Sequence, residues 1–113
     1  MKSEPRKLDE LRAQTSALKD LVEYAANSIV SREIVKSQGG SVTVFAFDQG
    51  QGLSEHTAPF DALVYNIEGE GEITISGTKH TLSAGDLIIM PAHEPHALLA
   101  TSKFKMLLVM IKS

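Results

Sequence analysis

The chain has 113 residues, a formal net charge of −3 at pH 7 and no cysteine. Its length is usual for one domain, and the lack of cysteine excludes both disulfides and thiolate metal sites. The weakly acidic charge gives no basis for binding nucleic acid or an anionic membrane, and no apolar run is long enough to span a bilayer. We therefore expect a cytoplasmic protein without a signal peptide.

The first 27 residues are predicted to form a helical segment. Within residues 5–26, apolar or small side chains recur at spacings of three and four, which places them on one face of a helix. This stripe consists of Leu8, Leu11, Thr15, Leu18, Val22 and Ala25. Pro5 suits the first turn and Asn27 suits the end. Charges of both signs cover the other face, so the stripe should pack on the rest of the chain or on a second subunit.

Residues 28–113 are predicted to form an all-β domain. Short runs rich in Val, Ile and Thr alternate with turn signals such as Gln-Gly-Gly at 38–40, Glu-Gly-Glu-Gly at 68–71 and Ala-Gly-Asp at 84–86. Turns at such close intervals, without helices between them, are typical of an antiparallel jelly-roll sandwich or barrel and exclude a parallel α/β sheet. The expected pattern continues to the end, where Lys103 and Lys105 face outward while Phe104 and Met106 face inward.

The first expected strand, residues 28–37, mixes apolar and charged residues on both faces, as an edge strand does. An uncovered edge and an apolar helical stripe are liabilities that a two-fold partner removes. The sequence therefore predicts a homodimer.

Strand alternation predicts a cluster of histidines at one end of the barrel. His56 shares a strand face with Ala58, and after a turn at 59–61 the next strand can direct Ala62, Val64 and Asn66 into the same interior. A tight turn at 91–96 carries two more histidines, His93 and His96. In a jelly roll, His56 and His96 converge inside the barrel mouth and His93 lies on its rim. His80, among polar neighbours, is expected at the surface.

Two motifs resemble those of the cupins, specifically the small single-domain proteins with a conserved barrel of the RmlC type. The resemblance covers about residues 40–111. The first motif places glycines, histidines and a glutamate at the positions of Gly50, His56, Ala58, Ala62 and Gly69. The second motif falls on Gly85, Pro91, His93, His96 and Ala100.

The resemblance implies a jelly-roll barrel and a divalent transition metal held by three histidines and one glutamate. This chain keeps only His56 and His96 of those ligands, because alanines stand at the places of the second histidine and the glutamate. Two imidazoles make a poor metal site. His93 is the candidate third ligand, so a site of His56, His93 and His96 for Fe, Mn, Ni, Zn or Cu stays open beside a metal-free barrel.

Two classes of function are compatible with these features. The first is a module that binds a small organic ligand, as a sensor or accessory protein, with contacts from His56, His93, His96, Asn66 and Met90. The second is an enzyme: a metal-dependent oxygenase or isomerase with a reduced ligand set, or a metal-free isomerase with a histidine as general base. Tyr65 has the parity of the outer face and supplies no acid partner. The remaining large apolar residues, among them Met106 and Met110, are predicted to fill the barrel.

Overall fold

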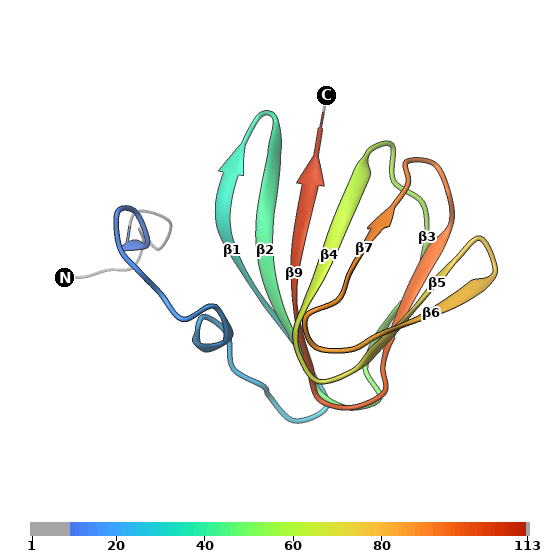
Figure 1. Cartoon of the computed structure of the whole chain (residues 1–113), viewed down its shortest axis with the longest axis horizontal. Helices are drawn as coiled ribbons and strands as arrows, with labels where there is room; N and C mark the ends of the chain where they lie inside the picture. Colours follow the sequence, from blue (N-terminus) through green and yellow to red (C-terminus); the bar gives the residue numbers. More distant parts are fainter. Residues whose placement is uncertain (1–9, 113) are drawn as a thin grey trace.

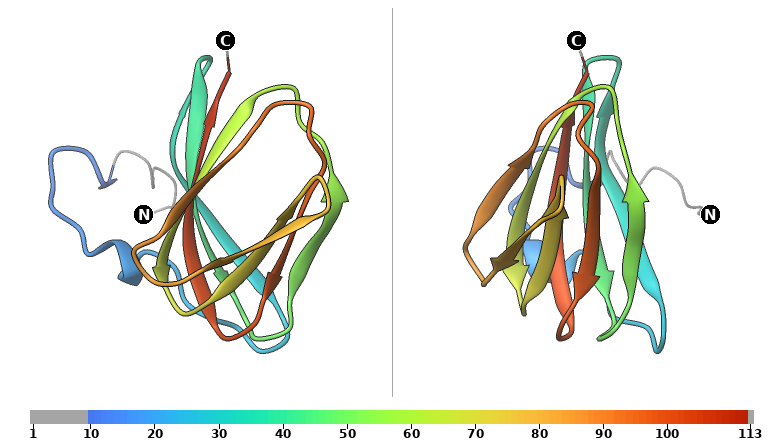
Figure 2. Two further views of the ribbon diagram at one scale, coloured as in Figure 1. Left: turned by 45° about the vertical axis from the view of Figure 1, so that its right-hand side comes forward. Right: turned by 90° about the vertical axis from the view of Figure 1, so that its right-hand side faces the viewer.

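The structure, a computed structural model, describes residues 10–112 of the chain. These residues form two antiparallel sheets that face each other (Figures 1 and 2). The five-stranded sheet, called sheet A here, has the order β1 (Ile29–Ser37), β2 (Gly40–Phe47), β9 (Phe104–Ile111), β4 (Asp61–Glu68) and β7 (Leu87–Met90). Sheet B has the order β3 (Gly52–His56), β8 (His96–Ala100), β5 (Gly71–Ile75) and β6 (Thr78–Leu82). The predicted all-β antiparallel fold is confirmed.

The main core lies between the two sheets and follows from strand alternation. Phe47, Val64, Ile73, Phe104 and Met106 are almost completely buried there. Their inward direction agrees with the parity predicted for the last strand. The structure also has turns where the sequence predicts them. One example is the two-residue hairpin between β5 and β6 at Ser76 and Gly77, whose φ angles are 48° and 85°.

The N-terminal segment is much less helical than the sequence predicts. Between residues 11 and 27 its helical structure is one 3-10 turn, η1 (Leu18–Asp20), and residues 5–9 of the predicted helix lie outside the described range. A positive φ angle at Ala13 (60°) interrupts a regular helix within the predicted range. Two residues of the stripe nevertheless pack on the chain's own barrel, because Leu18 and Val22 join a second apolar cluster on the outer face of sheet A.

Lys105 points away from the barrel interior, as predicted, but it is buried beneath the N-terminal segment. Its Nζ donates a hydrogen bond to the carbonyl oxygen of Lys19 (2.6 Å), lies 4.0 Å from a Glu68 carboxylate oxygen and sits over the Tyr24 ring. Its side chain therefore helps to hold the segment on sheet A. Within the described range, no helix is long and apolar enough to cross a membrane.

Candidate functional site

Two imidazole rings meet at one end of the barrel. His56 ends β3, His96 begins β8, and the two residues are direct partners in the antiparallel register. Their Nε2 atoms are 3.1 Å apart, and the rings meet edge to face with centroids 4.4 Å apart. His96 is buried, with 6% of its surface exposed, whereas His56 is exposed. The predicted convergence of His56 and His96 is present in the structure.

Backbone carbonyls fix the tautomer of both rings. Nδ1 of His56 lies 2.9 Å from the carbonyl oxygen of Ser54, and Nδ1 of His96 lies 3.1 Å from that of Glu94. A carbonyl oxygen only accepts, so each Nδ1 carries the hydrogen and each neutral ring leaves Nε2 with a free lone pair. Two lone pairs then face each other, and the contact becomes attractive when a proton or another electron-pair acceptor lies between them.

A cavity of about 80 Å³ lies beside the pair, between the two sheets. Sheet B contributes the imidazoles, and sheet A contributes side chains from β4, β7 and β9. The lining residues are Leu53, His56, Ala58, Phe60, Ala62, Val64, Met90, His96, Ala97, Leu98, Met106, Leu108 and Met110. The volume exceeds the roughly 10–15 Å³ that one water needs, but it is small beside pockets for drug-sized ligands, about 300–1,000 Å³.

Ala58 and Ala62 both line this cavity, as expected from the sequence, although only Ala62 lies in a strand and Ala58 follows the end of β3. Ala62 is the direct register partner of Met90 on β7 and of Met110 on β9. From the sequence, Met110 is predicted only to fill the barrel, but it lines the cavity. Strand order and register, which place it beside Ala62, cannot be read from the spacing of residues in one chain.

His93 does not join the pair. Its side chain is exposed and absent from the cavity wall, its φ is 68°, and its backbone N–H donates to the carbonyl oxygen of Ala58 (2.7 Å). The turn that carries His93 is thus held by its backbone. In residues 10–112, no three His, Cys, Asp or Glu side chains lie together in a way that could hold a metal ion. The predicted site of His56, His93 and His96 is not assembled.

Asn66 is fully buried, but it supports the fold away from the cavity wall. Its Nδ2 donates to the carbonyl oxygens of Gly69 and Leu82, both at 2.9 Å. These bonds join the end of β4 to the end of β6. Of the other predicted contacts, Met90 lines the cavity, and His80 lies partly exposed in β6.

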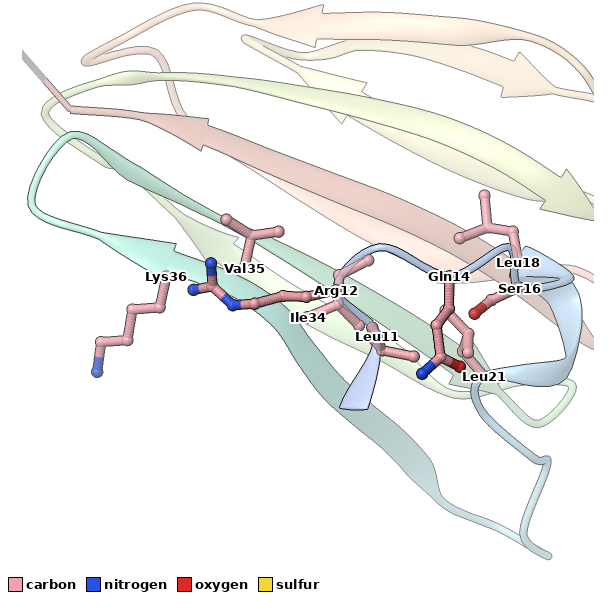
Figure 3. A pocket seen from close by; sticks show the side chains of 9 residues that line it. All are labelled: Leu11, Arg12, Gln14, Ser16, Leu18, Leu21, Ile34, Val35 and Lys36. Carbon is pink, nitrogen blue, oxygen red and sulfur yellow. The ribbon is translucent and has the colours of Figure 1, made fainter. Parts of the chain in front are cut away.

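A second hollow, of about 420 Å³, lies between the N-terminal segment and β1 (Figure 3). Leucines and the apolar side chains of Ile34 and Val35 line it together with Arg12 and Lys36. Figure 3 shows the Arg12 and Lys36 side chains at one end of the hollow and Gln14 and Ser16 toward the other. The hollow contains no converging pair of titratable groups, so the histidine cavity is the better candidate site.

Comparisons with known proteins agree with this architecture. The family described as "Cupin domain" (Cupin_2) matches residues 43–112. A conserved Streptococcus pyogenes protein of unknown function, SPY1581, is 39% identical, with a TM-score of 0.85 over 89% of each chain. A cupin superfamily protein from Desulfitobacterium hafniense is 28% identical, with a TM-score of 0.85 over 90% of this chain and 94% of that one.

An enzyme shares the fold at greater distance. A salicylate 1,2-dioxygenase from Pseudaminobacter salicylatoxidans is 16% identical, with a TM-score of 0.70 over 77% of this chain and 27% of that chain. This likeness shows a common fold alone. No curated protein matches the chain.

Proposed function

The chain belongs to the cupin domain family, and we propose that it is a cytoplasmic module that binds a small organic ligand in the cavity beside His56 and His96. The observation that supports this proposal is the contrast within the cavity wall. Aliphatic, phenyl and thioether side chains cover most of it, and one polar group, the imidazole pair, lies at one end. Such a site binds by burying apolar surface and orients its ligand by one polar contact.

The size of the cavity limits the ligand. A volume of about 80 Å³ holds a group of about five to eight non-hydrogen atoms, judged by the space that waters occupy. A larger ligand would extend through the barrel end. The metal site of the family does not fit this wall, because Ala58 and Ala62 supply no donor where the resemblance places a histidine and a glutamate.

Saturation-transfer NMR on protein without a histidine tag, screened against small acids, amides and alcohols, tests the proposal. We expect at least one compound to receive magnetisation from the native protein. Ala62→Leu fills the cavity and should abolish this transfer. Leu99→Ala, at an exposed position outside the wall, should preserve it. A screen in which no compound distinguishes Ala62→Leu from the native protein would contradict the proposal.

The free Nε2 lone pairs favour an enzyme as the second candidate. An imidazole that already donates through Nδ1 can take a substrate proton at Nε2, as a general base does in an isomerase. A ligand found in the screen should then exchange an activated C–H for deuterium in D₂O, and His96→Gln should abolish the exchange. Exchange that persists in His96→Gln would contradict this role.

A further inference from the structure

We propose that the cavity is a copper(I) site in which Nε2 of His56 and of His96 and the thioether sulfurs of Met90 and Met110 bind the ion. This inference goes beyond the binding of an organic ligand. It concerns a donor set that differs from the three histidines and one glutamate that the resemblance implies. Four observations on the cavity support it.

The first observation is the chemistry of the wall. Among the residues that line the cavity, the only side chains with a nitrogen, oxygen or sulfur atom are two histidines and three methionines. The wall has no carboxylate, amide or hydroxyl group, which are the ligands that Mg²⁺, Ca²⁺ and Mn²⁺ prefer. Imidazole suits copper, and thioethers select the soft ion Cu(I).

The second observation is the position of two of these methionines. Ala62 stands where the family places its carboxylate, and in the register of sheet A it lies between Met90 on one side and Met110 on the other. Because the side chain of Ala62 is a single methyl group, it leaves space on the inner face of the sheet for the longer side chains of Met90 and Met110. The two thioethers therefore flank the position of the missing carboxylate, on the sheet opposite the imidazoles.

The third observation is the spacing of the two imidazole nitrogens. If both Nε2 atoms, 3.1 Å apart, bound one ion at the usual metal–imidazole distance of about 2.0 Å, the N–metal–N angle would be about 100°. This value is close to a tetrahedral angle. The pair can thus act as a chelate without movement of the strands, and an ion replaces the repulsion of two lone pairs by two bonds.

The fourth observation is the hydrogen bonding behind the rings. Metal-binding histidines usually donate their other ring N–H to a carboxylate, a backbone carbonyl or a water, which fixes the tautomer and the ring orientation. Both rings do so here, with Ser54 and Glu94 as the acceptors. The ligands are therefore preorganised on paired strands rather than on mobile side chains.

Anaerobic competition with the chromogenic chelator bicinchoninate, on protein without a histidine tag, tests the proposal. We expect one Cu(I) per chain to be retained against the chelator. Met90→Leu with Met110→Leu should weaken binding by about 100-fold, and His96→Ala should abolish it. His80→Ala is the matched control for the histidine: it lies outside the cavity wall and should bind as the native protein does. Melting curves followed by circular dichroism check that each variant folds.

Spectroscopy distinguishes this site from one made by the imidazoles alone. Copper X-ray absorption should show sulfur as well as nitrogen neighbours, and Ag(I) should shift the methyl signals of Met90 and Met110 but not that of Met106. Release of all copper to the chelator, a nitrogen-only shell, or equal affinity for Zn(II) would each overturn the proposal. The organic-ligand screen is to be run on metal-free protein, so failure of the copper site does not decide that screen.

Discussion

Two small residues, Ala58 and Ala62, determine which metal-binding groups the cavity wall lacks. Ala62 could be assigned to the interior from sequence spacing alone, because side chains alternate between the two faces of a strand, whereas Ala58 reaches the interior from the loop after β3. The contact between His56 and His96 could be anticipated from the expected jelly-roll pairing of the strands. The flanking of Ala62 by Met90 and Met110 could not, since it depends on which strands pair and in what register.

Restoring the family's ligands should convert the cavity into a divalent metal site. Ala58→His with Ala62→Glu adds two donors beside His56 and His96, so affinity for Mn, Ni or Zn should rise steeply. Without metal, each unpaired buried group should destabilise the fold by about 1–3 kcal/mol, and added metal should restore stability. Calorimetric titration and thermal melts measure both effects.

Two further substitutions control this experiment. His96→Ala in the same background should abolish the gain in affinity, whereas His80→Ala, outside the cavity wall, should preserve it. If the double variant neither binds metal more tightly nor melts at a higher temperature with metal, Ala58 and Ala62 do not occupy the ligand positions.

Asn66 shows why a buried polar residue on an interior face need not belong to a binding site. Its two hydrogen bonds satisfy carbonyl groups at the ends of two turns, and neither partner is visible in the local sequence pattern. Asn66→Leu should leave both carbonyls without this donor and lower the free energy of unfolding by about 1–3 kcal/mol. Urea unfolding measures the loss. Thr81→Ala, at an exposed position in β6, should change stability little, and an equal loss there would refute the assigned role.

The strands and the N-terminal segment differ in how far local sequence determines them. Glycine-containing turns and alternation are local signals, so the β-rich region from residue 29 was predictable. Leu18 and Val22 do lie on one side of the segment, as their helical spacing predicts. They reach the outer face of sheet A, however, from a mostly irregular segment. Packing against Val44 and Ala46 therefore outweighs the weak helical preference of a short segment.

Tyr24 links this segment to the barrel, and its ionisation should report on the contact. Its hydroxyl donates to a Glu68 carboxylate oxygen (2.7 Å), and burial, followed by this bond and the negative charge of Glu68, raises the pKa of Tyr24 above its ordinary value. The contact should stabilise the fold fully below the pKa of an unfolded tyrosine, about 10. Its contribution should be lost as the pH rises above that value, through the raised pKa of Tyr24.

Tyr24→Phe tests this linkage, because Tyr65 is then the only tyrosine left. An absorbance titration should lose its most alkaline tyrosine step, and stability in the alkaline range should depend less on pH than it does in the native protein. A titration in which both native tyrosines ionise near pH 10 would contradict the assigned contact.

The outer face of sheet A leaves part of the molecule's apolar surface uncovered. One row across all five strands is apolar and in register: Val35, Val42, Val109, Leu63 and Ile89. The N-terminal segment covers the neighbouring cluster around Val44, whereas Val35 and Ile89 at the two ends of the row are each 53% exposed. β1 also lies at a sheet edge, as its mixed pattern predicted. Leu18 and Val22 of the N-terminal stripe are thus covered within the chain, and we expect the row to be the surface that a second copy covers.

We expect two copies to associate through this row, because a two-fold axis lets the same apolar surface cover itself and a stable interface needs about 1,200–2,000 Å² of total buried area. Light scattering after size exclusion should therefore give the mass of a dimer at micromolar concentration. Ile89→Lys places a charge at one end of the row and should give a monomer with unchanged strand content by circular dichroism. Leu99→Lys adds the same charge to an exposed position on sheet B and should leave the dimer intact. A native protein that is monomeric, or a dimer that survives Ile89→Lys but not Leu99→Lys, would show that this face does not carry the association.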